Sequence, residues 1–334
     1  MNLKMRKNKS SDMVKKYGEE YAGDSKFVAD CRKLQSIYRI EKLQDIRPYK
    51  GRDGKLHYYG NYIYDGEESG ANFLTKYTFD YAKERTNPKR KKPYETIDSD
   101  RLFNNLLSSQ PMAFNLFCPL RQMLEKSPEI LTEVIKAALP NYGIGSVKSI
   151  ELEFIPHNYK DLTGDRSAMD AIITYTDTFG RDAFVAIETK YSENLGTNVA
   201  FEQGTKEPRK QTLKAVKRIA CFTPDIEELI NKGKIRLTQI YRNFLLSEMY
   251  GIDSKQESYS IVLAPHRHPS TDREVSSLSQ VLRSEHKKKI CSLSLELFVD
   301  RIIGTCPEEY KLVFELFKDR YLNFDKLHIA DNGV

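Results

Sequence analysis

Hydrophobic residues recur every three or four positions over much of this chain, a spacing typical of helices that bury one face. On this basis we predict helices over 27–46, 71–86, 206–231 and 234–251. The segment 47–70 is rich in Gly, Tyr and Asp, which favours turns and short strands. The first part of the chain is therefore expected to be mainly helical.

The apolar block over 99–125 also has helical spacing, but it contains Pro111 and Pro119. Proline removes a backbone donor and disrupts the interior of a helix, so we predict two or three short helices here. Ser127 follows with Pro128 directly after it, and this pair predicts a capped helix that begins at residue 128.

Five shorter segments are dominated by apolar and β-branched residues and predict strands. The segments 147–156, 167–177 and 181–191 follow one another, and TDTFGR between the last two predicts a hairpin turn. Two more strands are predicted over 259–265 and 290–298. This order of elements indicates an α/β protein with a mixed central β-sheet flanked by helices.

Two regions of the chain are expected to fold differently. Residues 1–98 would form a mainly helical N-terminal extension with a basic tail, and residues 99–334 would form the α/β domain. We expect the polar residues 1–25 to be loosely attached, as chain ends without apolar residues often are. With 334 residues, 40% of them hydrophobic, the chain is large enough for a sizeable core.

The charge of the chain does not identify a partner. Lys and Arg number 53 and Asp and Glu number 47, so the net charge of +6 is mildly basic. Cationic clusters over 89–92, 206–218 and 283–289 suit a phosphate backbone, although such runs are more often solvated surface. Charge by itself therefore does not establish nucleic-acid binding.

Several classes of protein are disfavoured by motifs that the sequence lacks. It has no signal peptide, no membrane-spanning run, and no motif of the GxxxxGK[ST], GxSxG or HExxH type. Five cysteines without a CxxC pair favour reduced thiols in a cytoplasmic protein over a disulfide framework or a zinc site. These are Cys31, Cys118, Cys221, Cys291 and Cys306.

Charged residues interrupt two predicted strands where apolar residues are expected. The run FVAI continues directly into Glu188 and Lys190, which alternation places on one face of the strand. Asp170 is a lone carboxylate in the preceding strand, and a hairpin brings it close to Glu188 when the register permits. Burial of such charges is costly unless they are compensated. Two carboxylates and an ammonium at this place predict a site for a hard cation such as Mg²⁺.

An Asp on one strand and Glu-x-Lys near the end of the next resemble the PD-(D/E)xK nuclease superfamily, to which many restriction endonucleases belong. The ordered blocks RLFNNLLSSQPMAFNLFCPL, TGDRSAMDAIITY, AIETKYSEN and QIYRN are similar to a bacterial family of restriction-endonuclease-like proteins. The resemblance extends from about residue 60 to beyond residue 265. It implies a restriction-endonuclease-like core and a nuclease that hydrolyses DNA phosphodiester bonds with a divalent metal.

The resemblance also implies roles for individual residues. Asp170 and Glu188 would hold Mg²⁺, for which Mn²⁺ would substitute, together with the carbonyl of Thr189. Lys190 would lie beside the attacking water, whose pKa the metal lowers. The residue before Asp170 is Met169, where the name of the superfamily has proline.

Further catalytic residues are expected by the same resemblance. The superfamily often has another acidic residue upstream, and Glu153, which interrupts the first core strand, is the first candidate. Glu133 on the helix that follows Ser127 is the second. Gln239 resembles a helical glutamine found downstream in some of these nucleases.

Three polar residues are candidates for contacts with nucleic acid. Arg242 and Asn243 lie three and four positions after Gln239 and would share its helix face. Arg166, in the loop before the second core strand, would contact phosphate or pair with Asp165.

Each candidate also has a plainer interpretation. Glu188 and Lys190 could pair at a solvated strand end, and Asp170 could bond backbone amides. His266 and His268 have a spacing that would suit a metal pair, but without a third ligand nearby we interpret them as loop residues.

The main alternative function is a catalytically silent module with the nuclease fold that binds nucleic acid or another protein. No feature of the sequence separates RNA from DNA as the substrate. A homodimer would suit a reaction on both strands of a duplex, and no membrane partner is expected.

Overall fold

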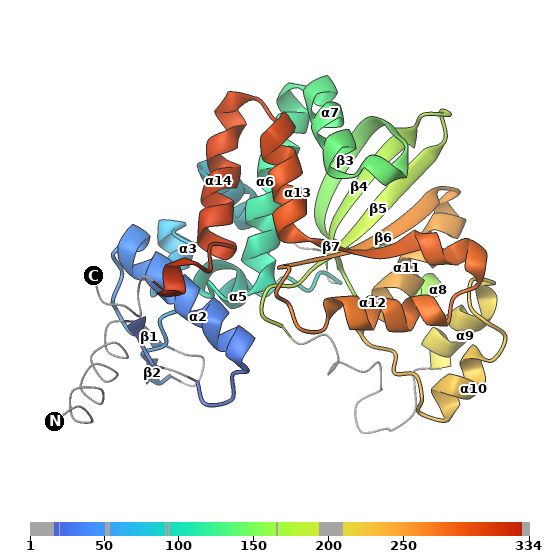
Figure 1. Ribbon diagram of the computed structural model, residues 1–334, viewed down its shortest axis with the longest axis horizontal. Coiled ribbons are helices and arrows are strands. Elements are labelled where there is room, and N and C mark those ends of the chain that lie inside the picture. Colours follow the sequence, from blue (N-terminus) through green and yellow to red (C-terminus); the bar gives the residue numbers. More distant parts are fainter. Residues whose placement is uncertain are drawn as a thin grey trace.

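A five-stranded sheet lies at the centre of the computed structural model, in the order β3-β4-β5-β6-β7 (Figure 1). The pairs β3-β4 and β4-β5 are antiparallel, whereas β5-β6 and β6-β7 are parallel. Helices cover both faces, so the predicted class, a mixed sheet flanked by helices, is confirmed. The strands are β3 (Ile144–Phe154), β4 (Met169–Asp177), β5 (Asp182–Thr189), β6 (Glu257–Ala264) and β7 (Ile290–Ser294). The structure describes residues 17–19, 21–50, 54–90, 92, 94–164, 166–193 and 210–328.

The predicted hairpin joins β4 to β5. The Asp177 side chain closes the turn by accepting hydrogen bonds from the backbone N–H groups of Phe179 and Arg181, both at 2.8 Å. Gly180 has φ +80°, a conformation that residues with a Cβ rarely adopt. The turn sets the register in which Ala171 of β4 pairs with Ile187 of β5. This register positions the charged ends of both strands.

One face of the sheet is covered by α6 (Ser109–Lys126) and α7 (Pro128–Ala138), with α13 (Leu295–Thr305) and α14 (Glu308–Tyr321) beside them (Figure 1). Phe114, Phe117 and Phe298 are fully buried in this layer. No helix in the described part of the chain is both long and apolar enough to span a bilayer.

The apolar block 99–125 contains fewer breaks than predicted. A short helix, α5 (Ser99–Asn104), precedes α6, which runs unbroken for 18 residues through Pro119. Pro111 lies in the first turn of α6, where backbone N–H groups have no partner within the helix, so it fits without cost. Burial of α6 along most of its length holds the helix together across Pro119.

Two further boundaries differ from the predictions. Ser127 makes no capping hydrogen bond through its side chain; instead its backbone N–H ends α6 by donating to Met123 O at 2.7 Å. The strand predicted over 290–298 is β7 only as far as Ser294, whose hydroxyl accepts from Leu297 N at 3.2 Å. This bond caps α13, so the second half of the segment is helical.

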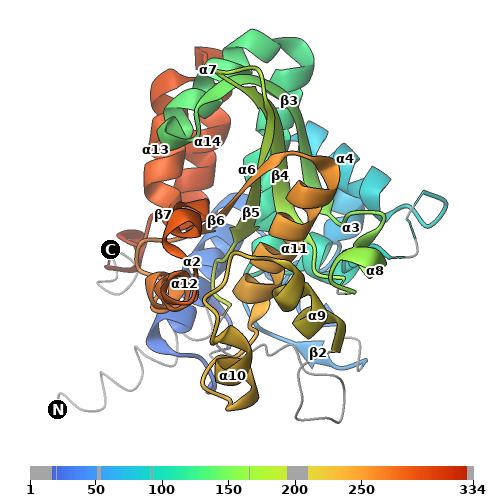
Figure 2. The ribbon, with the colours of Figure 1, turned by 90° about the vertical axis from the view of Figure 1, so that its right-hand side faces the viewer.

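The opposite face of the sheet is covered by α11 (Gln239–Ser254), as Figure 2 shows. Phe184 and Ala186 of β5 pack there with Phe244 and Leu245 of α11 in a second hydrophobic core. Because β5 has a core on each face, its apolar run is continuous, as expected for a strand buried on both sides. Smaller helices lie on the same side: α8 (Tyr159–Leu162), α9 (Lys210–Arg218), α10 (Ile226–Asn231) and α12 (Thr271–Gln280).

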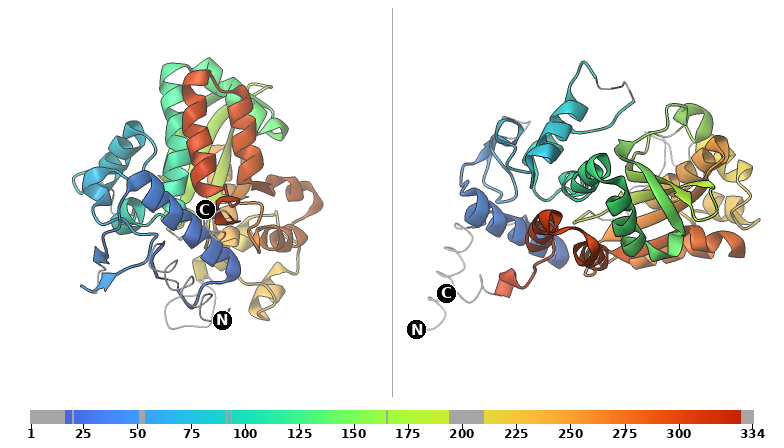
Figure 3. Two further views of the ribbon diagram at one scale, coloured as in Figure 1. Left: turned by 60° about the vertical axis from the view of Figure 1, so that its left-hand side comes forward. Right: turned by 90° about the horizontal axis from the view of Figure 1, so that it is seen from above.

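The N-terminal region packs against the helical layer formed by α6 and α14 (Figure 3). Leu34 and Ile37 share a core with Phe314 and Phe317 of α14. The predicted basic tail lies mostly outside the described residues, and the predicted domain boundary at residue 98 stays a prediction. The elements are α2 (Lys26–Tyr38), the π-helix η1 (Arg39–Leu43), β1 (Tyr49–Lys50), β2 (Leu56–His57), α3 (Gly66–Ser69) and α4 (Lys76–Thr86).

Arg320 on α14 links this helix to the N-terminal region. Its guanidinium is fully buried and donates hydrogen bonds to Gln35 Oε1 at 3.1 Å and to the backbone oxygen of Asn72 at 2.8 Å. Buried acceptors that lose their donor cost about 1–3 kcal/mol each. The packing of the N-terminal region therefore depends strongly on this side chain.

We predict that Arg320→Met lowers the free energy of unfolding by at least about 3 kcal/mol, because it leaves buried acceptors unpaired. Urea unfolding followed by circular dichroism measures the change. The matched control is Lys318→Met on the same helix, which removes an exposed ion pair with Asp300 and should cost less than about 1 kcal/mol. Equal stability of the two variants would contradict the prediction.

Candidate active site

Three carboxylates lie in a row across neighbouring strands. Ala171 of β4 pairs with Leu152 of β3 on one side and with Ile187 of β5 on the other. Antiparallel strands run in opposite directions. The residue that precedes Ala171 on β4 therefore lies beside the residue that follows Leu152 on β3 and beside the residue that follows Ile187 on β5. These three residues are Asp170, Glu153 and Glu188.

Asp170 is anchored to the end of β5. Its Oδ2 accepts hydrogen bonds from the backbone N–H of Thr189 at 2.6 Å and from the Thr189 hydroxyl at 2.8 Å. The plainer interpretation, a carboxylate that bonds backbone amides, is therefore part of the arrangement. These bonds also hold the carboxylate in one orientation beside Glu188.

Glu188 and Lys190 form a buried ion pair. Lys190 Nζ lies 2.6 Å from Glu188 Oε1, and the side chains are only 7% and 4% exposed. The pair is thus not at a solvated strand end. Lys190 Nζ also donates to Gln239 Oε1 at 2.9 Å, and Gln239 is the first residue of α11. A helix on one face of the sheet therefore orients the lysine.

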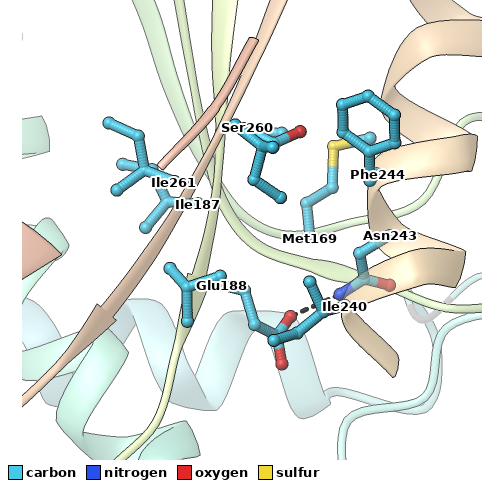
Figure 4. A pocket seen from close by; sticks show the side chains of 11 residues that line it. Met169, Ile187, Glu188, Ile240, Asn243, Phe244, Ser260 and Ile261 are labelled. Carbon is cyan, nitrogen blue, oxygen red and sulfur yellow. Dashed lines mark hydrogen bonds between the residues drawn. The ribbon is translucent and has the colours of Figure 1, made fainter. Parts of the chain in front are cut away.

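Figure 4 shows Glu188 directed toward Asn243 on α11. The amide nitrogen of Asn243 donates a hydrogen bond to Glu188 Oε2. Met169 and Ile240 line a cavity of about 20 Å³ beside this contact, enough for about one water molecule. The cavity is too small for a nucleotide, so any substrate would approach these side chains from elsewhere.

Glu153 has an unusual backbone conformation. Its φ of +48° lies in the left-handed region, which non-glycine residues seldom occupy and which costs about 1–3 kcal/mol. The residue is 7% exposed, and its Oε1 accepts a hydrogen bond from Gln110 Nε2 at 2.9 Å. Strain of this kind is concentrated at functional sites.

The positive charges of nearby lysine and arginine side chains compensate only in part for the burial of the three carboxylates. Burial, followed by the charge of Asp170, raises the pKa of Glu153 to about 7 and that of Glu188 to about 8. Burial also raises the pKa of Asp170, and the charge of Lys190 offsets this only in part. The site therefore favours an additional positive charge.

Lys190 is charged in this environment. Burial lowers its pKa, but the negative charges of Glu188 and Asp170 outweigh burial, and its pKa lies above the ordinary value. The side chain is thus an ammonium that faces carboxylates.

The carboxylates offer a partial ligand set for a metal ion. In the part of the chain that the structure describes, no group of three or more His, Cys, Asp or Glu residues is arranged as a complete metal site. Mg²⁺ is commonly bound by one or two carboxylates, with water and substrate oxygens completing its coordination. The oxygen-rich pair Asp170 and Glu188, whose charge Lys190 compensates only in part, fits a hard cation of this type.

A comparison with family models agrees with this geometry. The model of the PD-(D/E)XK nuclease superfamily matches residues 22–323, which is most of the chain. The chain belongs to the PD-(D/E)XK nuclease superfamily. No curated protein and no solved structure matched the sequence. The superfamily resemblance and the restriction-endonuclease-like fold expected from the sequence are thereby confirmed.

Glu193 is a partly buried residue, four positions after Thr189 at the end of β5, that the sequence analysis missed. Its Oε1 accepts hydrogen bonds from the backbone N–H and the hydroxyl of Ser109, both at 2.8 Å. Burial raises its pKa, but the charge of Lys190 and the bonds from Ser109 outweigh burial, so its pKa lies below the ordinary value. The motif block AIETKYSEN contains Glu193, so its nearness to Lys190 was the available signal.

His268 contacts the same segment. Its Nε2 lies 3.0 Å from the backbone oxygen of Glu193, and its Nδ1 lies 2.8 Å from the Thr271 hydroxyl. His266 is exposed. The two histidines thus have different surroundings, which is consistent with the interpretation that they are loop residues.

Glu133 lies away from the superfamily's motif residues. It is exposed on α7 and pairs with Lys136 at 2.7 Å. Glu153 is therefore the upstream acid that the structure brings beside Asp170. Arg242 lies on α11 within one turn of Gln239, as predicted from their spacing.

Arg166 lies in surroundings that favour carboxylates over phosphate. It lines an open depression together with several acidic side chains, whereas its alternative partner Asp165 lies outside the described residues. The acidic residues of the depression are Glu67, Glu95, Asp98 and Asp100.

The cationic clusters have different environments. Arg90 and Lys92 line an open groove of about 500 Å³ that reaches Glu153. Lys289 lies 3.3 Å from the buried Glu248 and so contributes to the fold. The first four residues of the middle cluster, and one of the first cluster, lie outside the described residues.

We predict that Glu153→Gln stabilises the protein at high pH. The pKa of Glu153 is about 7 in the folded protein and about 4.5 when unfolded, so folding favours the protonated carboxyl. Stability should fall as pH rises from about 4.5 to about 7, by about 3 kcal/mol in total, and Gln removes this loss. Urea unfolding in EDTA at several pH values measures the difference from the original protein.

The control for this experiment is Glu133→Gln, which neutralises an exposed carboxylate. Its stability relative to the original protein should change little with pH. The difference in stability between Glu153→Gln and the original protein could instead stay constant from pH 4.5 to 8. Ionisation of Glu153 would then not destabilise the folded protein, and the prediction would be wrong.

Proposed function

We propose that this protein is a nuclease that hydrolyses DNA phosphodiester bonds with the help of Mg²⁺, for which Mn²⁺ can substitute. The observation that carries this proposal is the set of carboxylates on β3, β4 and β5, whose pKa values are raised by burial and, for Glu153 and Glu188, also by the charge of Asp170. A cation would relieve this repulsion, and members of the superfamily are generally nucleases.

Asp170 and Glu188 would hold the cation, together with the carbonyl of Thr189. When bound, the cation would lower the pKa of a water molecule and offset negative charge that develops on the phosphate. Glu153 lies beside Asp170 and would accept a proton or a hydrogen bond from that water.

Lys190 would supply a fixed positive charge. Its Nζ is placed between Glu188 Oε1, at 2.6 Å, and Gln239 Oε1, at 2.9 Å. An ammonium has three protons, so one is left to orient the attacking water or to contact a phosphate oxygen. Asn243 would keep Glu188 in place through its hydrogen bond.

The alternative, a silent module with the same fold, is less well supported by these residues. Glu153 has a strained backbone, and all three carboxylates are destabilised as anions. A protein that only binds a partner gains nothing from such costs at this place, whereas catalytic sites commonly carry them.

The proposal also includes a cellular compartment and an oligomeric state. All five cysteines are free, as is usual in the reducing cytoplasm. A homodimer would allow both strands of a duplex to be cut, and sedimentation of the protein bound to duplex DNA would test for it.

We predict that Asp170→Ala and Lys190→Ala each lower the rate of plasmid cleavage in Mn²⁺ by three or more decades. This corresponds to about 4 kcal/mol of lost transition-state stabilisation. Gel analysis of plasmid DNA measures the rate, and a parallel reaction with single-stranded RNA identifies the substrate.

The matched controls are Asp182→Ala and Lys148→Ala. These residues form an exposed Lys–Asp ion pair on the same sheet, with 2.5 Å between Nζ and Oδ1. Cleavage by the controls should stay within a few-fold of the original rate. Full activity in both Asp170→Ala and Lys190→Ala would overturn the proposed site.

A further inference from the structure

Gln110 connects α6 to the row of carboxylates. It is the second residue of α6, and the residue is 9% exposed. Its backbone N–H donates to the Ser108 hydroxyl at 3.2 Å, which caps the helix. The preceding residue, Ser109, donates to Glu193. The start of α6 is therefore fixed beside the ends of β3 and β5.

The orientation of the Gln110 amide follows from its contact with Glu153. The amide nitrogen of Gln110 faces Glu153 Oε1, 2.9 Å away, which is the orientation that suits the anionic carboxylate, whose oxygens only accept hydrogen bonds. The amide oxygen, Oε1, is then the atom of the amide that does not face Glu153. It is buried and has no hydrogen-bond partner among the residues that the structure describes.

A buried acceptor without a donor is unfavourable, and native proteins rarely leave one unexplained. The unpaired oxygen belongs to the side chain that holds Glu153, and Glu153 has the strained backbone. The unpaired oxygen of Gln110 and the strained backbone of Glu153 are both unfavourable, and both occur at the same contact beside Asp170. A ligand that brings a donor to this place would account for the unpaired oxygen.

We propose that Gln110 Oε1 belongs to the cation site, where it accepts a hydrogen bond from a water molecule of a hydrated divalent cation. This inference rests on the proposed function. Mg²⁺ and Mn²⁺ retain bound water when few protein groups hold them, and such water donates strongly. Gln110 would therefore bind the hydrated ion with its oxygen and position Glu153 with its nitrogen.

The neutral amide is suited to this role. The carboxylates at the site already repel one another. A fourth carboxylate in place of Gln110 would increase this repulsion, whereas an amide adds an oxygen acceptor without charge. The same side chain thus serves the cation without destabilising the protein further.

The first test is Mn²⁺ titration of Gln110→Met by calorimetry, with Mn²⁺ as the only ligand. Methionine keeps the length and flexibility of the side chain but has no amide. We expect the dissociation constant to rise at least about tenfold, as is usual when a supporting group of a metal site is removed. A dissociation constant within twofold of the original value would overturn the inference, since an ordinary buried water would then satisfy Oε1.

The matched control is Gln256→Met. Gln256 also has a buried Oε1 without a partner in the described structure, but it precedes β6 at the opposite end of the sheet from Glu188. Its loss should leave Mn²⁺ binding unchanged. An equal loss of affinity in both variants would show a general effect of substitution and would contradict the inference.

A second variant, Gln110→Glu, separates a role in binding from a role in folding. It should lower the melting temperature in EDTA, because it adds a negative charge beside Glu153. Saturating Mn²⁺ should then raise its melting temperature by more than it raises that of the original protein. The same deficit with and without Mn²⁺ would mean that Gln110 acts in folding alone.

Asp170→Asn in the same titration separates a failure of the inference about Gln110 from a failure of the proposed cation site. If Asp170→Asn abolishes Mn²⁺ binding while Gln110→Met does not change it, the inference about Gln110 fails and the proposed site stands. If Asp170→Asn leaves Mn²⁺ binding unchanged, the proposed site fails and the inference fails with it.

Discussion

Desolvation of neighbouring carboxylates, to which the charge of Asp170 adds repulsion, is the constraint on which the candidate site depends. Glu153, Asp170 and Glu188 lie side by side at the ends of three strands, where burial disfavours their charged forms. The ammonium of Lys190 offsets this effect without removing it. A protein can maintain such a group of charges only because the surrounding core is large enough to supply the stability.

The supporting groups around the carboxylates are amides and hydroxyls. Gln110 comes from α6 on one face of the sheet, whereas Gln239 and Asn243 come from α11 on the other. Each fixes a charged side chain through a hydrogen bond without changing the net charge of the site. The two helices thus act as rigid supports, and rigid supports are what a catalytic constellation requires.

The resemblance to the PD-(D/E)XK superfamily and the order of elements were both predictable because they depend on local sequence. The hairpin from β4 to β5 follows from a tight turn between two apolar runs, and its register places Asp170 beside Glu188. Predictions that relied on the helix or strand propensity of individual residues were less accurate. Pro119 does not end α6, because burial of the helix outweighs the lost hydrogen bond, and Ser294 begins α13 within a segment of strand-like composition.

The sequence was enough to predict the five strands of the central sheet, that Glu188 and Lys190 share a face, and that the chain resembles a nuclease. These properties depend on a period of two residues and on neighbours in one hairpin. Tertiary structure alone decided that Glu153, not Glu133, lies beside Asp170, that Glu193 binds the start of α6, and that Gln110 reaches Glu153. Those contacts join residues 43 and 84 positions apart, and their meeting depends on how helices pack across the sheet.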